Sequence, residues 1–227
     1  LITERTEPHL GVLIQYSDMA GPRRRRMELK AASRKPGSLG VSVIGAGNYA
    51  RLMLIPALMK QPQIRLRGLC AAGGLHAEHA GRASGFEFAA TDIEEVLKDP
   101  ETAAVFIATR HDLHADFVLA ALKAGAYQAA TGLVDALVTA PVSKEAMRLI
   151  EPRFLGHTEY LARVAKTKRF AMMFVSERLK VTLVTIHVAL KKVISNITRA
   201  AVLEKILLTD QFLKRYFVLE SPRLAVC

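Results

Sequence analysis

Two groups of residues in this sequence have types and spacing that could do chemistry. The first is the run Gly45-Ala46-Gly47-Asn48-Tyr49-Ala50, which directly follows an apolar segment at 41–44. The second is a pair of histidines, His157 and His187, each at the expected boundary of a helix or strand. Glycine turns bind phosphates through backbone N–H groups, and neutral imidazoles bind divalent metals.

The glycine run has the order that a dinucleotide site requires: a strand, a turn, then an amphipathic helix from about residue 50. Gly45 permits the tight turn, Gly47 lets the backbone approach a pyrophosphate, and Ala50 is the third small residue, at the helix–strand contact. Backbone N–H groups near Asn48 and Tyr49 would face the phosphates. The alternative is a turn that only packs and binds no ligand.

The choice between NAD and NADP stays open. An acid at the end of the second strand normally holds the ribose hydroxyls, but the expected strand at 64–70 ends in Cys70-Ala71-Ala72. The next acid is Glu78. A 2′-phosphate would need a cation such as Arg51 or Arg82.

The segments that follow alternate between strand and helix patterns. Helices are expected at 76–84 and 92–98, strands at 87–89 and 103–108, and a helix after the second of these strands. This alternation predicts an α/β fold with a Rossmann-like parallel sheet and helices on both faces.

Two stretches, VSVIGAGNYARLMLIPAL and DIEEVLKDPETAAVFIATRHDLHADFVLAALKAG, resemble the nucleotide-binding half of the Gfo/Idh/MocA oxidoreductases over residues 11–126. The resemblance implies that Thr109, Arg110, His111 and His114 lie over the nicotinamide end of the cofactor. His111 and His114 could also be loop and helix-start residues without a chemical role.

That resemblance stops at Ala126–Gln128. The family pattern calls there for a strand ending in Glu-Lys-Pro, whose lysine assists hydride transfer, but this chain has Ala126-Tyr127-Gln128-Ala129-Ala130. We therefore expect a join between two incomplete enzyme segments within residues 122–139.

Beyond the expected join, the sequence predicts strands at 133–139, 170–175, 181–186 and 223–227. It also predicts a helix capped by Ser143, a helix opening at Gly156-His157, and a long helix at 198–217. From spacing alone, His157 and His187 are either metal ligands or ordinary hydrogen-bonded histidines, because a catalytic metal site usually needs three protein ligands.

The segments ALVTAPVSKEAM, FLGHTEYLA and AMMFVSERLKVTLVTIHVALKKV resemble 4-hydroxythreonine-4-phosphate dehydrogenase, the PdxA family, over residues 129–227. The resemblance implies an isopropylmalate-dehydrogenase-like α/β/α fold, NAD, a dimer and a divalent metal such as zinc or magnesium. It makes His157 and His187 two of the metal ligands. Lys144 would either face a phosphate or carboxylate of the substrate or be an ordinary surface lysine. Thr158 and Glu159 would either orient His157 or only cap the helix that begins there.

The chain stops at Cys227, before the segment in which this family carries a third metal histidine. We therefore expect a truncated, fused oxidoreductase with a basic tail at 1–39, a nucleotide-binding domain at 40–127 and a partial PdxA-like segment at 128–227. Its inherited activity, oxidation of a phosphorylated hydroxy acid in pyridoxal phosphate biosynthesis, is expected to be too impaired to detect. The alternatives are an inert nucleotide-binding or interaction module, or a rearrangement product without a selected function.

The composition of the chain limits the classes of partner that it is expected to bind. The formal charge is +11, from 32 Lys+Arg against 21 Asp+Glu, which attracts phosphate-bearing molecules. The arginines at 23–26 lack interleaved aromatic residues, which argues against a nucleic-acid partner. Two cysteines give no disulfide framework, and no apolar run is long enough to cross a membrane, so a cytoplasmic location is expected. Sheet edges left open by missing strands favour pairing with another copy of the chain, so a homo-oligomer is expected. The start without Met suggests that the sequence is a fragment.

Overall fold

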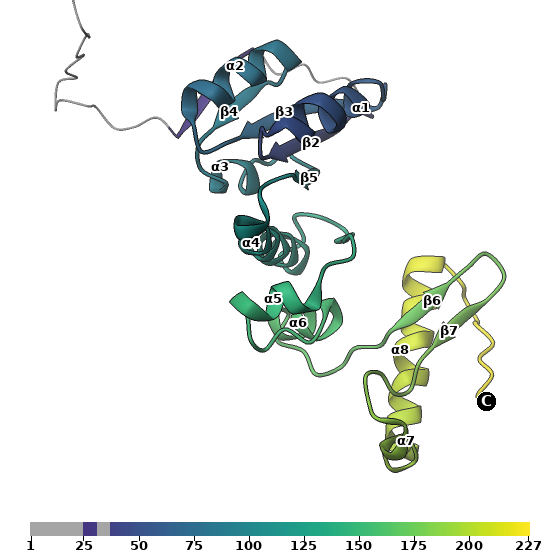
Figure 1. Cartoon of the computed structure of the whole chain (residues 1–227). Coiled ribbons are helices and arrows are strands. Elements are labelled where there is room, and N and C mark those ends of the chain that lie inside the picture. The colour runs from purple at the N-terminus through teal and green to yellow at the C-terminus, as the bar shows by residue number, and fades with distance from the viewer. Residues whose placement is uncertain (1–24, 31–36) are drawn as a thin grey trace, which may run out of the picture. The chain divides into compact units, whose positions relative to one another are not determined.

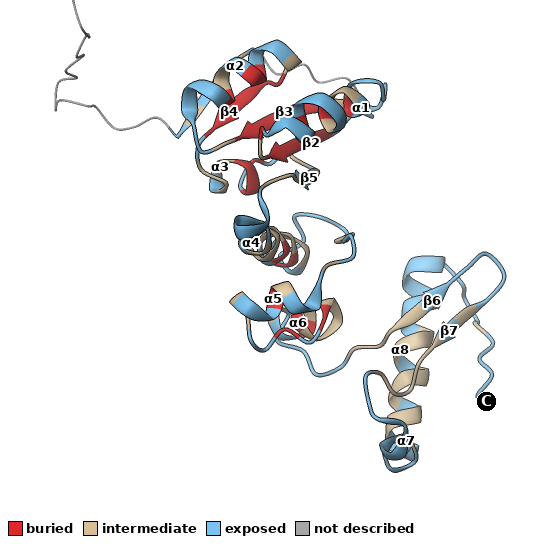
Figure 2. Ribbon diagram, viewed as in Figure 1, coloured by how far each residue is buried: buried red, intermediate tan, exposed pale blue. Residues whose placement is uncertain are grey.

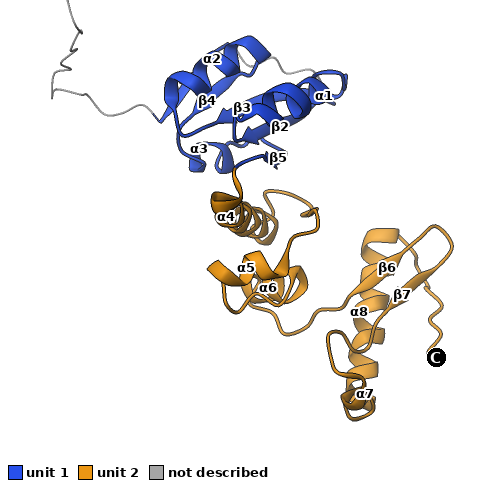
Figure 3. Ribbon diagram, in the orientation of Figure 1, with its two compact units in different colours: residues 1–109 blue, residues 110–227 orange. Residues whose placement is uncertain are grey.

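A computed structural model of the chain describes residues 25–30 and 37–227. Most of the arginine run at 23–26 lies outside these residues. Residues 1–109 and 110–227 form two compact units, blue and orange in Figure 3. This division falls earlier than the boundary expected near residue 127, and the three predicted domain ranges remain a prediction.

Unit 1 is built on a five-stranded sheet with the order β1-β4-β3-β2-β5 (Figure 1). Its strands are β1 (Arg26–Glu28), β2 (Leu39–Ile44), β3 (Ile64–Cys70), β4 (Phe88–Ala90) and β5 (Ala104–Ile107). Strands β2 to β5 pair in parallel, and β1 is antiparallel to β4. The prediction of an α/β fold with a mainly parallel sheet is confirmed.

The helices of unit 1 are η1 (Ala50–Leu54), α1 (Ile55–Met59), α2 (Gly74–Ser84) and α3 (Glu94–Leu97). The helix expected after the glycine turn begins as a π-helical turn, η1, and becomes α-helical at Ile55. Pro56, at the start of α1, has no N–H to donate, so the regular ladder cannot run through it unbroken.

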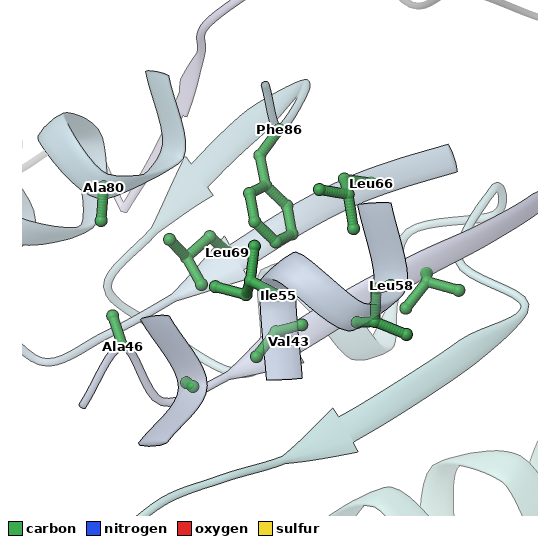
Figure 4. Close-up of a cluster of buried hydrophobic side chains, with 10 residues drawn as sticks. Val43, Ala46, Ile55, Leu58, Leu66, Leu69, Ala80 and Phe86 are labelled. Atoms are coloured by element: carbon green, nitrogen blue, oxygen red, sulfur yellow. The ribbon is translucent and has the colours of Figure 1, made fainter. Parts of the chain in front are cut away.

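The core of unit 1 lies between the sheet and helices α1 and α2 (Figure 4). Val43 from β2, Leu69 from β3 and Ile55 from α1 are at most 1% exposed. Burying each such side chain contributes about 1.5–3 kcal/mol before the entropy cost of folding. Consecutive residues of β2 are buried, so both faces of this central strand are covered.

Charged side chains are also buried at the end of the sheet where β3 begins. Arg67 donates to Asp99 over 2.8 and 2.9 Å and to Glu87 over 2.7 Å. Arg26 reaches the same Asp99 over 3.2 Å and thereby attaches β1. Because a buried charge is costly without partners, this network fixes the order of β1, β4 and β3.

Unit 2 begins with three helices, α4 (His111–Ala130), α5 (Lys144–Ile150) and α6 (His157–Val164). They pack around Leu122, Met147, Phe154 and Tyr160, and Ser143 Oγ accepts a hydrogen bond from the Ala146 N–H to cap α5, as predicted. Helix α4 continues through residues 126–128, where the join was expected.

The rest of unit 2 is an antiparallel hairpin, β6 (Met173–Val175) and β7 (Lys180–Thr182), followed by α7 (Leu190–Asn196) and α8 (Arg199–Phe217). The strands expected at 170–175 and 181–186 form only over Met173–Val175 and Lys180–Thr182, whereas the expected long helix is confirmed, with Thr198 Oγ1 as the cap of α8. Most residues of this part are exposed or half-buried, as Figure 2 shows in blue and tan.

Two predicted strands are wrong. Residues 133–139 and 223–227 contain no strand, and most of them are exposed. An apolar run becomes a strand only when another strand completes its hydrogen bonds, and neither run finds one. Instead, Leu137 packs on α4 beside Gly125. Among the described residues, no helix is both long enough and apolar enough to span a membrane.

Candidate functional site

The glycine turn follows β2 and is held by its neighbours. Gly45 has φ +106°, and its N–H donates to the Cys70 carbonyl over 2.8 Å. A Cβ at Gly45 would lie 2.5 Å from the Ala108 carbonyl oxygen, so only glycine fits there. A Cβ at Gly47 would meet nothing within 4 Å, which leaves that backbone open to a ligand. Ala50 is fully buried at the third small position.

The turn lies at the point where the order of the sheet reverses. From β2 the chain moves to β3 on one side, while β5 pairs with β2 on the other. Ligands of such sheets bind at this switch point, beyond the carboxyl ends of the strands. Asn48 and Tyr49 follow the turn and are exposed. Here the first N–H groups of the helix lack partners within the helix and can donate to phosphate.

Thr109 follows β5 at the same end of the sheet. Its Oγ1 is buried and has no hydrogen-bond partner in the structure. A buried hydroxyl without a partner is uncommon and indicates a group that a ligand or water satisfies. The structure therefore brings Gly45 and Thr109 together, as the prediction of a cofactor site requires. The other residues predicted to lie over the nicotinamide are exposed at the start of α4, in unit 2: Arg110, His111 and His114.

A second group of polar side chains gathers in unit 2 at the start of α6. Gly156 is buried, and a Cβ built there would lie 3.2 Å from Glu159 Oε2 and 3.8 Å from Lys144 Nζ. The missing side chain thus gives room for a carboxylate from α6 and an ammonium from α5. Lys144 is placed here by its position directly after the Ser143 cap.

The two predicted metal ligands both belong to this group. His157 opens α6 beside the Phe154 ring, with centroids 6.0 Å apart. Burial, and then the charge of Lys144, lower the pKa of His157, so this imidazole is neutral near pH 7. His187 has φ +53° between β7 and α7, and its Nε2 lies 3.7 Å from Glu159 Oε1.

Glu159 connects the group. Its Oε1 faces His187, and its Oε2 is buried without a hydrogen-bond partner. The sequence suggested that Thr158 and Glu159 would orient His157, whereas the contact of Glu159 is with His187. Sequence reasoning therefore missed this partner, although its place two residues after His157 was the available signal.

The donor set does not fit a resident metal by itself. Among residues 25–30 and 37–227, no three His, Cys, Asp or Glu side chains come close enough together to hold a metal ion. His157 and His187 could supply only part of such a site. The arrangement does provide a neutral imidazole, a carboxylate–imidazole pair and a cation, which can exchange a proton and hold an anionic substrate group.

Comparisons with known proteins agree with these features. The family model described as pyridoxal phosphate biosynthetic protein PdxA matches residues 63–227. A 4-hydroxythreonine-4-phosphate dehydrogenase from Desulfosudis oleivorans is 45% identical over 98 residues, which are 43% of this chain and 29% of that protein. A D-threonate 4-phosphate dehydrogenase from Pectobacterium atrosepticum is 34% identical over 134 residues, 59% of this chain and 40% of that protein.

Among solved structures, levoglucosan dehydrogenase in complex with NADH and L-sorbose is 28% identical, with a TM-score of 0.34. The match covers 39% of this chain and 25% of that one.

The relatives are dehydrogenases, and the family match includes the whole of the Lys144, His157, Glu159 and His187 group. The chain belongs to the PdxA family. The resemblance predicted for the second half is confirmed, and the family match also extends back to residue 63, within unit 1. The chain spans about three tenths of the length of the first relatives it matches.

Proposed function

We propose that this protein is an NAD(P)-dependent dehydrogenase that oxidises a phosphorylated hydroxy acid, as its relatives' names indicate for them. The observation that carries the proposal is the convergence of Lys144, His157, Glu159 and His187 at the start of α6, within the family-matched residues.

The chemistry follows from the side chains. Lys144 would pair with the substrate phosphate or carboxylate as a point charge. Neutral His157 would accept the proton of the substrate hydroxyl group. A hydride from the carbon that carries this hydroxyl would pass to the oxidised nicotinamide, which yields a ketone and the reduced cofactor. The Glu159 carboxylate, 3.7 Å from His187 Nε2, would orient the His187 ring.

His157 and His187 remain the predicted ligands of a divalent metal, but a third donor would have to come from outside the described residues. We therefore derive no step through a metal. Four expectations from the sequence also remain part of this proposal. They are an isopropylmalate-dehydrogenase-like fold in the second half, a fusion of two enzyme segments, a homo-oligomer, and a turnover that is weaker than that of a complete enzyme.

In unit 1, the proposed cofactor site is the turn from Gly45 to Ala50 together with Thr109. It is supported by the open backbone at Gly47 and the unsatisfied hydroxyl of Thr109. Binding of the reduced cofactor can be measured by its fluorescence, independently of any turnover.

The test uses the full chain with phosphorylated 4-hydroxythreonine and phosphorylated D-threonate, each with NAD or NADP. In place of the undetectable turnover expected from sequence, we expect measurable substrate binding and slow cofactor reduction, both weakened by Lys144→Gln, with reduction abolished by His157→Ala. Arg178→Gln, in the hairpin turn, is the matched control and should behave like the unmodified chain. Absence of substrate binding would refute the proposal.

A second candidate is a nucleotide-binding module without catalysis. It is favoured by the open backbone at Gly47 and the unsatisfied hydroxyl of Thr109, which could bind a nucleotide without any group of unit 2. Cofactor binding without any reduction, at all substrate and metal concentrations tested, would select this candidate.

A further inference from the structure

The outer edge of the proposed nucleotide site carries an arginine from a strand that the glycine pattern does not include. Arg25 immediately precedes β1, which adds an antiparallel edge to β4. The backbone carbonyl of Arg25 accepts a hydrogen bond from the Thr91 N–H over 2.9 Å. Arg25 is thereby fixed beside the carboxyl end of β4.

This position adjoins the place where the adenosine ribose of a dinucleotide would lie. The Ala71 N–H, directly after β3, donates to the Ala90 carbonyl over 3.0 Å. A Cβ at Gly74, the first residue of α2, would lie 3.3 Å from Thr91 Cγ2. The end of β4 and the turn after β3 are therefore in contact, and the ribose is recognised at that turn.

Asp92, a carboxylate that acts on Cys70 at the end of β3, is already engaged by other donors. Asp92 Oδ2 accepts from Arg25 Nη1 over 2.7 Å, and Asp92 Oδ1 accepts from the Glu94 N–H over 3.0 Å. Burial, and then the charge of Asp92, raise the pKa of the Cys70 thiol to about 12, which agrees with a position of Asp92 close to the end of β3. Residues 71–77 contain no acid.

Of the cations suggested by sequence, Arg82 is placed differently, on α2. Arg82 is paired with Glu78 over 3.0 Å along α2. Arg25 is also paired with a carboxylate, but it lies beside the end of β4, and its side chain is 68% exposed, so its guanidinium is oriented and open to a further anion. His76 connects α2 to the glycine turn, with Nε2 3.4 Å from the Ala46 carbonyl oxygen.

We propose that the nucleotide site of unit 1 selects the 2′-phosphorylated cofactor, NADP, and that Arg25 binds the 2′-phosphate. This inference rests on the proposed nucleotide site. An arginine held by a carboxylate presents fixed donors to phosphate, and the missing acid after β3 removes the group that favours an unmodified ribose.

The experiment is a titration of the full chain with NADPH, NADH, 2′,5′-ADP and 5′-ADP by calorimetry. We expect NADPH and 2′,5′-ADP to bind at least about tenfold more tightly than NADH and 5′-ADP, as one charge-assisted contact supplies. Equal or tighter binding of NADH overturns the inference but leaves the proposed site intact. Binding of neither dinucleotide refutes the proposed site itself, and the inference with it.

Arg25→Gln separates the role of this residue from the fold. It should lower NADPH affinity about tenfold without lowering NADH affinity or the melting temperature. Arg82→Gln is the matched control, because it removes an equal charge from α2 and should change neither affinity. If Arg25→Gln weakens NADH as much as NADPH, or weakens neither, Arg25 is not the phosphate ligand.

Discussion

The imidazole Nε2 of His187 lies 3.7 Å from the carboxylate Oε1 of Glu159, although 28 positions separate the two residues along the chain (187 − 159). His187 takes a left-handed backbone conformation, which is costly for a residue with a side chain. Strain of this kind persists where surrounding structure enforces it, and it is concentrated at functional sites. The relationship supports a role for Glu159 in orienting His187.

Gly156 provides a direct test of the space around this pair. Gly156→Ala would place a Cβ 3.2 Å from Glu159 Oε2, and the backbone φ of 165° is extended and open to alanine. We therefore expect little loss of stability but a displaced Glu159, with substrate affinity about tenfold lower. Calorimetric titration with the phosphorylated substrate measures this. Unchanged affinity would show that Glu159 does not act on the substrate.

The titration of His157 is the second prediction. Burial and the Lys144 charge lower its pKa from 6.5, so the folded protein binds fewer protons here than the unfolded chain. The stability from this group is complete above the unfolded value and is lost as pH falls below it. Lys144→Gln should raise the His157 pKa, measured by NMR of the imidazole protons. A pKa unchanged by that substitution would exclude the charge of Lys144 as a cause.

Much of unit 1 could be predicted from sequence because its signals are local. The glycine turn, the run at 64–70 and the alternation of helices all depend on neighbouring residues, and β3 (Ile64–Cys70) has the predicted bounds. The cap at Ser143 and the helix after Thr198 were predictable for the same reason.

The parts of the fold and of the candidate site that could not be predicted depend on contacts between residues far apart in the sequence. The run at 133–139 has the composition of a strand but finds no partner strand, so propensity alone gave the wrong answer. Arg25 reaches Asp92 only because β1 adds to the edge of β4. Glu159 meets His187 through the folding of unit 2, and no sequence period encodes that pairing.

Acid stability provides a third prediction. Burial acts to raise the pKa of Asp99, but hydrogen bonds from Arg67 and Thr102 outweigh it and lower the pKa. The contribution of Asp99 is therefore present above the unfolded value near 3.8 and is lost as pH falls through the folded pKa. Asp99→Asn should cost about 2 kcal/mol in free energy of unfolding at neutral pH, measured in urea, because Arg67 loses the charge of one carboxylate partner while its hydrogen bond to Glu87 remains.

Glu94→Gln is the control for that measurement. It breaks an exposed pair with Lys98 and should leave the free energy of unfolding nearly unchanged. Equal effects of the two substitutions would contradict a special role for the buried network.

Introducing the missing acid should reverse cofactor choice. Ala71→Asp places a carboxylate directly after β3, where it can accept hydrogen bonds from ribose hydroxyls and repel a 2′-phosphate. We expect NADH affinity to rise and NADPH affinity to fall, each by about tenfold, in fluorescence titrations. Ala71 packs partly against the core, so the melting temperature is measured alongside. A folded variant with unchanged preference would exclude recognition of the ribose at this turn.

Alanine substitutions at the two glycines of the turn should distinguish an effect on folding from an effect on cofactor binding. Gly45→Ala meets the Ala108 carbonyl at 2.5 Å and must hold φ near +106°, so it should destabilise unit 1 by about 2 kcal/mol or more and abolish cofactor binding. Gly47→Ala has no neighbour within 4 Å and should leave the melting temperature unchanged. Its methyl group would stand where the pyrophosphate approaches, so cofactor affinity should still fall about tenfold. If Gly47→Ala binds the cofactor like the unmodified chain, the phosphates do not rest on this turn, and the open space at Gly47 has no ligand-binding role.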